Sequence, residues 1–338
     1  MNNIFNYTRN NLEKEFVDLG YKKFMASQVL DWLYKKRNYN VDEYSNIKKE
    51  NRDFLKEQYS FDLIKIEKVE EDTDVKKFLF RLLDGQKIEA VLMYHGYGLS
   101  LCVSSQVGCN MGCKFCESGR LKKVRNLETY EMVEQVLLIS DYVKGRIDSI
   151  VVMGIGEPFD NYDNVINFLS IINDDKLLAI GARHITVSTC GLVPKIKEYA
   201  SFPLQVNLAI SLHAPNDEIR KKIMPIANAY SINEVIDAVK YYSNKTNRRV
   251  AMEYILLDGI NDSVKCANEL ADLLNGVNAY VNLIPYNETS HIEYKASSES
   301  QIKIFFDTLK QRGVDVTTRR RFGSKISAAC GQLRSKEI

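Results

Sequence analysis

The chain has 338 residues with 45% hydrophobic and 27% charged side chains, as is typical of a folded globular protein, and its length allows one large domain plus an appendage. Its formal net charge of +2 excludes binding to nucleic acid through global charge alone, so any such binding needs local patches. No apolar run is long enough to span a membrane, and the polar N-terminus lacks the apolar core of a signal peptide. Three of the seven cysteines lie in one loop, which indicates a protein of the reducing cytoplasm rather than one held by a disulfide framework.

The first third of the chain changes its hydrophobic period once. Residues 1–60 place apolar residues at helical spacing, with Asn10 as a candidate cap of the first helix. The expected helices cover residues 11–19, 26–37 and 48–59. Residues 61–95 instead favour strands, over 63–69, 78–82 and 87–93, with a hairpin signal at Asp84-Gly85. We therefore expect an N-terminal helical accessory domain over 1–60 and a small β extension over 61–95.

From residue 96 to residue 338 strand and helix patterns alternate. The candidate strands are 99–105, 148–153, 184–189, 205–211, 248–256 and 279–285. The helical patterns between them include 130–143, 164–173, 232–242 and 264–274. This alternation predicts an α/β fold with a parallel sheet, either an open doubly wound sheet or a barrel. Both folds bind ligands at the carboxyl ends of their strands.

Chemically distinctive residues follow these strand ends. A glycine-rich turn, 154–158, follows the second candidate strand, and Asn287 lies just past the sixth. Cys109, Cys113 and Cys116 follow the first strand, at positions i, i+4 and i+7. Three thiolates indicate zinc or an iron–sulfur cluster, both of which prefer four ligands.

Two interpretations of the cysteine loop remain open from the residues themselves. A structural zinc ion needs a fourth ligand, such as Cys102 or a histidine. Because a chain of this size can build a core without a metal staple, a catalytic centre is favoured. Three thiolates then leave one iron of a 4Fe–4S cluster open to a small molecule.

The spacing Cys-x3-Cys-x2-Cys resembles the hallmark of the radical S-adenosylmethionine (SAM) superfamily. Segments 101–109, 181–189, 281–285 and 328–333 resemble the RlmN/Cfr family of radical SAM RNA methyltransferases over nearly the whole chain. The resemblance implies a partial (βα)6 radical SAM barrel, a 4Fe–4S cluster and bound SAM. It implies methylation of a ring carbon of an adenosine in 23S ribosomal RNA. The RlmN branch methylates C2 and also acts on tRNA, whereas the Cfr branch methylates C8 and confers antibiotic resistance.

Residue roles carry over from the same resemblance. The cluster ligands would be Cys109, Cys113 and Cys116. SAM would be held by Gly156, Glu157, Ser188, Ser211, Leu212, His213 and Asn287. Cys330 would carry the methyl group as S-methylcysteine, because an electron-poor ring carbon does not attack a sulfonium methyl directly. Glu89 would accept the ring proton, and Cys102 would release the product through a transient disulfide with Cys330. A flavodoxin-type or similar electron donor, a monomeric state and an RNA-binding role of the N-terminal domain are also expected.

Some residues depart from the family pattern. These are Glu117, Lys122, Lys325 and Ser327, which bear on the RNA substrate and on the carbon that is methylated. The residues around Glu157 favour C2. The alternatives are a C8 methyltransferase, a paralogue with another RNA target, and a non-catalytic zinc-bound RNA-binding protein. The basic runs 319–321 and 122–125 either contact phosphates or form solvated faces.

Overall fold

The computed structural model describes residues 1–289, 291–320, 326–328 and 331–333. Its strands are β1 (Asn2–Asn3), β2 (Tyr59–Ser60), β3 (Lys65–Asp72), β4 (Val75–Arg81), β5 (Lys87–His95), β6 (Gly98–Cys102), β7 (Gln106–Val107), β8 (Arg125–Asn126), β9 (Ser149–Val152), β10 (Ile185–Thr189), β11 (Asn207–Ser211), β12 (Val250–Leu256), β13 (Ala279–Pro285) and β14 (Val316–Thr318). Its α-helices are α1 (Arg9–Asp18), α2 (Phe24–Leu30), α3 (Lys49–Gln58), α4 (Thr129–Val143), α5 (Tyr162–Asn173), α6 (Val193–Tyr199), α7 (Asp217–Ile223), α8 (Ile232–Thr246), α9 (Val264–Leu273) and α10 (Glu299–Gln311).

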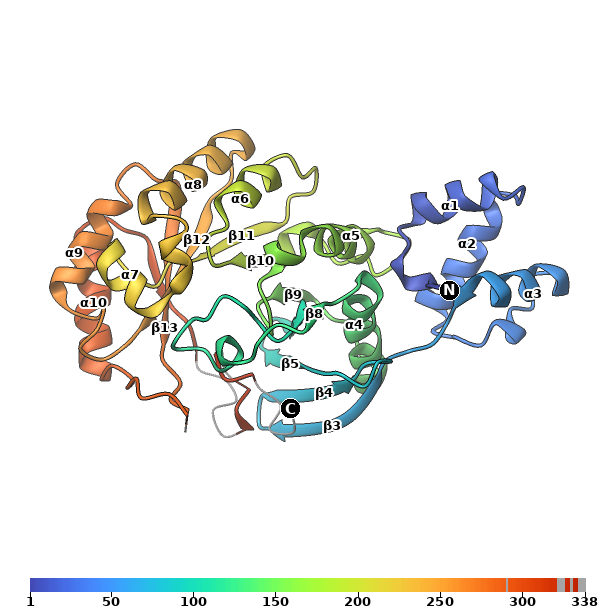
Figure 1. Ribbon diagram of the computed structural model, residues 1–338, viewed down its shortest axis with the longest axis horizontal. Helices are drawn as coiled ribbons and strands as arrows, with labels where there is room; N and C mark the ends of the chain where they lie inside the picture. The colour runs from blue at the N-terminus through green and yellow to red at the C-terminus, as the bar shows by residue number, and fades with distance from the viewer. Residues whose placement is uncertain (290, 321–325, 329–330, 334–338) are drawn as a thin grey trace.

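The six expected strands form a parallel sheet in chain order. The order β6-β9-β10-β11-β12-β13 is continued by a seventh parallel strand, β14, which is too short for the sequence pattern to reveal. Helices follow the strands and cover the outer side of the curved sheet (Figure 1). This is the expected partial (βα)6 barrel. Its strands are apolar along their length, β12 being buried throughout, because both faces of the sheet are covered.

The strands of the β extension continue this same sheet. β5 pairs antiparallel with β6, and β4 and β3 follow outward, giving ten strands in all. The expected hairpin at Asp84-Gly85 joins β4 to β5. The pairing places Val91 opposite Cys102 and Lys77 opposite Val91. The side chains of the β extension on this face, such as Val91, therefore lie beside Cys102 at the open end of the barrel.

The N-terminal unit is helical, as expected, and is closed by the short parallel pair β1–β2. Thr8 rather than Asn10 caps α1, since its hydroxyl accepts the Asn11 N–H at 3.3 Å. The first helix therefore begins two residues before the sequence pattern indicates. The unit lies beside α4 and α5 (Figure 1), and an ion pair joins Arg9 to Asp174 at 3.0 Å.

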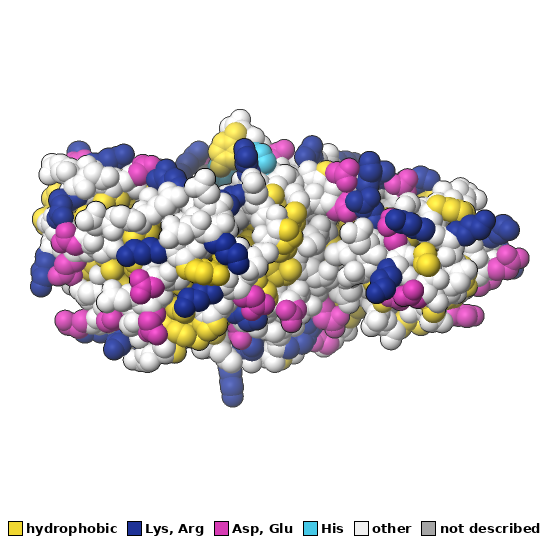
Figure 2. All heavy atoms as spheres, turned by 90° about the horizontal axis from the view of Figure 1, so that it is seen from above, with side chains coloured by type: hydrophobic (Ala, Val, Ile, Leu, Met, Phe, Trp, Pro, Cys, Tyr) yellow, Lys and Arg dark blue, Asp and Glu magenta, His cyan; other side chains and the backbone are white. Residues whose placement is uncertain are grey.

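The surface carries both signs of charge. Figure 2 shows basic and acidic side chains interspersed over both the N-terminal unit and the barrel, in agreement with the small net charge. Within the described residues, no helix is long and apolar enough to cross a membrane.

Candidate active site

A cavity opens at the carboxyl ends of the parallel strands. Its volume is about 150 Å³. Its lining includes Cys109, Cys113, Cys116, Gly156, Glu157, Ser188, Ser211 and His213. An adjoining hollow is lined by Cys102, Asn287 and Arg319, and shares Cys116 and Gly331 with the first. Most of the site residues expected from sequence thus meet in one place.

The cysteine loop is held at its base by main-chain contacts. The short antiparallel pair β7–β8 brackets it, and the Cys109 N–H donates to the Leu121 carbonyl at 2.9 Å. Gly108 has a φ of +74°, and a Cβ there would overlap the Lys122 carbonyl. A glycine is needed at this position because the loop returns against its own start.

Two thiols of the loop, Cys109 and Cys113, are neutral at physiological pH while no metal is bound. Burial raises the pKa of Cys109 to about 12 and that of Cys113 well above its usual value, and the neighbouring thiols raise both further. Arg220 opposes this effect at Cys113. Its fully buried guanidinium donates to the carbonyls of Leu212 and Cys190. Iron would bind these thiols as thiolates and displace their protons.

The three thiols fit an iron–sulfur cluster better than a single ion. Among the described residues, no three His, Cys, Asp or Glu side chains converge closely enough to hold one metal ion. A 4Fe–4S cluster makes no such demand, since each cysteine ligates a different iron. The structural zinc site closed by Cys102 is therefore not favoured by the geometry.

Glu157 is a fixed carboxylate in the cavity wall. Its Oε1 accepts the Phe159 N–H at 3.0 Å, and its Oε2 accepts the Cys190 N–H at 2.8 Å. Burial raises the pKa of Glu157, and hydrogen bonds to the charged form offset part of that rise. The preceding Gly156 has a φ of +112°, and a Cβ there would lie 2.6 Å from the Gln106 Cβ. The backbone can therefore make this turn only with glycine.

His213 presents a neutral ring to the cavity. Its Nδ1 accepts the Ile255 N–H at 3.0 Å, which assigns the ring proton to Nε2. Burial, and then the positive charge of Arg220, lower the pKa of His213 to about 3. Its neutral Nε2–H is thus a hydrogen-bond donor for a ligand. Leu212, beside it, packs in the main core instead.

Ser188 and Ser211 complete the polar wall at the ends of β10 and β11. Their hydroxyls lie 3.4 Å apart. Asn287 is buried and lines the adjoining hollow beyond β13.

The C-terminal segment packs on the barrel mouth. Ala328 and Leu333 share an apolar cluster with Val91 and Cys102. Cys330 and Lys325 lie outside the described residues, so the expected contact of Cys330 with Cys102 is not described. Cys102 itself is buried, and no disulfide occurs among the described residues.

The turn after the cysteine loop holds this C-terminal segment. The Glu117 N–H donates to the Gly331 carbonyl, and the Ser118 hydroxyl donates to the Leu333 carbonyl, both at 2.8 Å. The Glu117 carboxylate lies 3.3 Å from the Nδ1 of His291. The side chain that departs from the family pattern at residue 117 therefore contacts His291, whereas the main chain of the same residue contacts the C-terminal segment.

Glu89 lies on the same face of the sheet as Cys102, but deeper. Its side chain is 3% exposed and forms an ion pair with Lys77, whose Nζ is 3.5 Å from Oε1. The Ser104 hydroxyl donates to its main-chain carbonyl at 2.6 Å.

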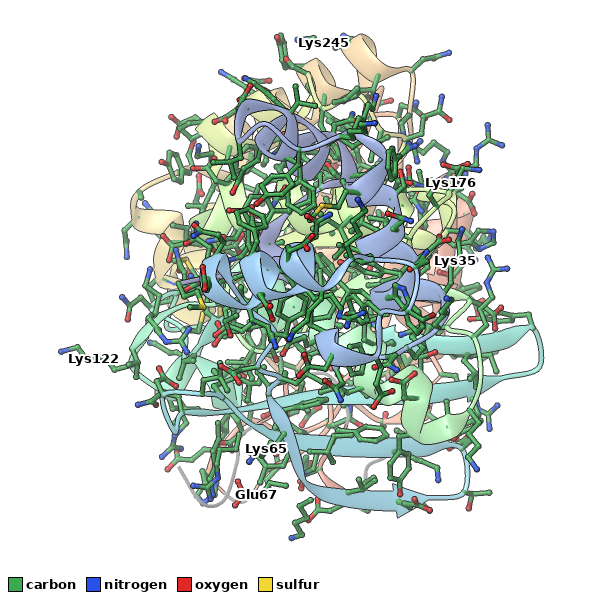
Figure 3. The ribbon with its side chains drawn as sticks, turned by 90° about the vertical axis from the view of Figure 1, so that its right-hand side faces the viewer. Lys35, Lys65, Glu67, Lys122, Lys176 and Lys245 are labelled. Atoms are coloured by element: carbon green, nitrogen blue, oxygen red, sulfur yellow. The ribbon has the colours of Figure 1, made fainter. Side chains whose placement is uncertain are left out.

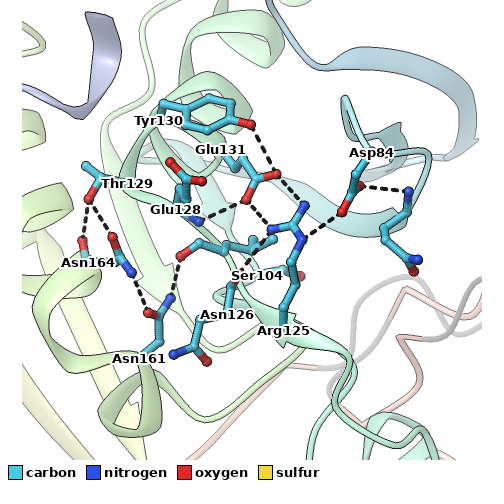
Figure 4. A network of polar contacts seen from close by, with 12 residues as sticks. Asp84, Ser104, Arg125, Asn126, Glu128, Thr129, Tyr130, Glu131, Asn161 and Asn164 are labelled. Carbon is cyan, nitrogen blue, oxygen red and sulfur yellow. Dashed lines mark hydrogen bonds and ion pairs between the residues drawn. The ribbon is translucent and has the colours of Figure 1, made fainter. Parts of the chain in front are cut away.

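The expected RNA-contacting basic residues divide into two groups. Lys123 pairs with Asp160 at 2.6 Å. Arg125 pairs with both Glu131 and Asp84 in a network that fixes the end of the cysteine loop (Figure 4). Both are structural in this conformation.

Other basic side chains remain near the site or on the surface. Lys122 is exposed and extends away from the body of the molecule (Figure 3). Arg319 lines the cavity, and Arg320 pairs with Asp74 at 2.8 Å. Arg321 lies outside the described residues.

Two charged residues near the cavity were not predicted from the sequence. Glu253 lines it from β12, where both carboxylate oxygens accept from the Asn282 amide, and burial raises its pKa. Its position within the apolar run of residues 250–256 is the signal that could have identified it. Arg220 had no such signal, since it lies on a short helix with an ordinary charge pattern.

Comparison with known proteins agrees with this geometry. Residues 103–270 match the profile of the radical SAM superfamily, and residues 2–60 match that of the ribosomal RNA large subunit methyltransferase N-terminal domain. A protein of Spiroplasma citri named probable dual-specificity RNA methyltransferase RlmN is 53% identical over 340 residues, covering 99% of this chain and 98% of that protein. Its namesake in Acholeplasma laidlawii is 51% identical over 338 residues, covering 99% of each. A crystal structure of a radical SAM methyltransferase from Sphaerobacter thermophilus superposes with a TM-score of 0.94 at 39% identity, covering 99% of this chain and 100% of that one.

Proposed function

The chain belongs to the RlmN/Cfr family of radical SAM RNA methyltransferases, which bind a 4Fe–4S cluster and SAM, and we propose that it methylates C2 of an adenosine in 23S ribosomal RNA. The observation that carries this proposal is the full-length match to proteins named RlmN, whose dual specificity we extend to tRNA here. The same match does not favour a C8 enzyme, a paralogue with another target or a non-catalytic zinc protein.

The cavity residues have the chemistry that the two cofactors require. Cys109, Cys113 and Cys116 would ligate the cluster and leave one iron open. The fixed carboxylate of Glu157 suits an ammonium group, and the neutral Nε2–H of His213 suits an acceptor on SAM. When bound, the cluster and SAM supply a methyl group and a carbon radical able to break an unactivated C–H bond.

Three further residues would act on the methyl group and the base. Cys330 would accept the methyl group on its sulfur and join its carbon to the adenine ring. Because the adduct is then a radical, one electron would pass from it back to the cluster, and Glu89 would take the proton that leaves the ring carbon. Cys102 would then attack the Cys330 sulfur, forming an S–S bond as the S–C bond breaks. The electron pair of that S–C bond stays with the product carbon, which takes up a proton and becomes the methyl group.

Cofactor content and the trapped adduct test this assignment. Protein purified without oxygen should contain about four iron and four sulfide per chain. Stoichiometric zinc without iron would contradict it. Cys102→Ala should accumulate a covalent protein–RNA adduct through Cys330, whereas free product release by that variant would show that Cys102 is not the resolving thiol.

RNA from a deletion strain tests the substrate. Nucleoside mass spectrometry should show loss of 2-methyladenosine from 23S ribosomal RNA and tRNA. Loss of 8-methyladenosine would support the Cfr-type alternative, and no loss would indicate another RNA. We further propose a cytoplasmic monomer that receives electrons from a flavodoxin-type donor, in keeping with its RNA substrate and its redox-active centre.

A further inference from the structure

We propose that Lys77 is a positioning residue that keeps Glu89 ionised and oriented for proton removal, with Glu70 anchoring Lys77 from the other side. The inference rests on the proposed role of Glu89. Nothing in the resemblance or the comparisons assigns a function to Lys77 or Glu70.

The sheet register brings the three side chains into one line. Lys77 on β4 is paired with Glu70 on β3 and with Val91 on β5. Glu89 lies two residues before Val91, so its side chain shares the face of Lys77. Cys102 is paired with Val91 on the other side, which puts the resolving thiol on the same face. One row of side chains on this face therefore runs from Cys102 on β6, beside the cavity, across β5 and β4 to Glu70 on β3, the outer strand of the sheet.

The Lys77 ammonium lies between two carboxylates. Its Nζ is 2.8 Å from Glu70 Oε2 and 3.5 Å from Glu89 Oε1. Lys77 is 6% exposed and Glu89 2% exposed, whereas the side chain of Glu70 is one-third exposed. A buried lysine is stable as a cation only when it is paired, and a buried carboxylate is stable as an anion only on the same condition. Each buried charge here therefore depends on the other.

Glu70 is an anion that holds Lys77 in place. Burial tends to raise its pKa, but hydrogen bonds from Lys77 and Lys68 outweigh that effect, so the pKa is lowered overall. Lys68 reaches Glu70 at 3.0 Å from the solvent side. Glu70 can therefore orient the ammonium without competing for a proton at neutral pH.

Other charged groups of this face have described contacts of their own. Arg81 and Lys87 both pair with Glu67, at 2.9 and 3.1 Å. From the C-terminal segment, Arg319 lines the cavity and Arg320 pairs with Asp74. The titratable group that β6 contributes to this face is Cys102. Lys77 is thus the cation for which ion-pair contact with Glu89 is described.

The pH dependence of methylation tests this assignment. The holoenzyme and its variants are given a single turnover of 23S ribosomal RNA at a series of pH values, and both 2-methyladenosine and covalent adduct are quantified. Lys77→Met should move the acid limb of the rate to higher pH by at least about one unit, so the rate at a fixed acidic pH falls about tenfold and adduct accumulates. Lys77→Arg should restore the profile. If Lys77→Met does not fold, Lys77→Gln removes the charge and keeps a donor.

A matched control lies next to Lys77 in the sequence. Lys76 is on the opposite face of β4 and pairs with Glu71 at 2.7 Å, so Lys76→Met should leave the profile unchanged. Iron content should be equal in all variants. A Lys77→Met profile that superposes on the wild type would overturn the inference. If Glu89→Gln were fully active instead, the role of Glu89 itself would be wrong, which separates the two failures.

Discussion

Cys109 links the protonation of the site to its stability. Burial raises its pKa to about 12, above the value of about 8.5 in an unfolded chain. The folded, cluster-free protein therefore binds this proton more tightly than the unfolded chain does. The resulting stabilisation is fully present below about pH 8.5 and is lost as the pH rises towards 12.

We expect the free energy of unfolding of cluster-free protein to fall by up to about 1.4 kcal/mol per pH unit above pH 8.5 through this group. Cys109→Ala removes the titrating thiol and should flatten that part of the dependence. Urea unfolding of both proteins at about pH 8 and about pH 10 measures it. Equal losses in the two proteins would show that Cys109 does not titrate in this way.

At the residue scale, roles that depend on spacing within one short segment could be predicted from the sequence. Roles that depend on contacts between distant segments could not. Cys109, Cys113 and Cys116 were identified because ligand type and spacing occur within one short segment. Lys77 and Arg220 were not, because their roles depend on the strand register and on a helix that packs behind the cavity. Glu89 and Cys330 were assigned only through the family resemblance.

The turn at 154–158 shows how one element shapes the cavity. Gly156→Ala combines an unfavourable φ with a Cβ 2.6 Å from Gln106, so we expect a loss of about 2 kcal/mol or more and loss of SAM binding. Gly259→Ala is the matched control, since Gly259 also has a positive φ but nothing within 4 Å of its Cβ position. It should cost about 1 kcal/mol and keep SAM binding. Unfolding of cluster-free protein and SAM titration of loaded protein measure both effects.

The turn after Cys116 makes a second prediction at this scale. Ser118→Ala removes the hydrogen bond to the Leu333 carbonyl, worth about 1 kcal/mol, so amide exchange at residues 331–333 should become severalfold faster. Ser170→Ala, which removes a similar bond to the Ile166 carbonyl in α5, should leave that exchange unchanged. Hydrogen exchange followed by mass spectrometry compares the two. Equal protection would mean that the contact does not hold the C-terminal segment.

The elements themselves were largely predictable. Six apolar segments became the six expected parallel strands because buried strands need continuous apolar sequence. β14 escaped because it has three residues, two of them exposed. One sheet contains both the barrel strands and β3, β4 and β5, because β5 pairs with β6. No local sequence pattern predicts that pairing.

The whole molecule brings the β extension, the barrel and the C-terminal segment together around one cavity, and the N-terminal unit docks beside α4. A buried carboxylate, Glu134 on α4, contacts the N-terminal unit by accepting from the Asn3 amide at 3.5 Å, and it contacts the β extension by accepting the Ile64 N–H at 2.8 Å. The β extension supplies Val91 and Met93 to the lining, the barrel supplies the cysteine loop, and the C-terminal segment packs over both. The composition and periodicity of the sequence predicted the helical unit, the β extension and the barrel. The contacts between these parts could be seen only in the structure.

The central claim is that the methyl group passes through a protein cysteine to C2 of adenosine. Holoenzyme given 23S ribosomal RNA and SAM with a fully deuterated methyl group tests it in one mass spectrum. Because one deuterium leaves the methyl carbon and one solvent proton returns to it, we expect 2-methyladenosine with two deuterium atoms. A product with all three methyl deuterium atoms, or one methylated only at C8, would contradict the account.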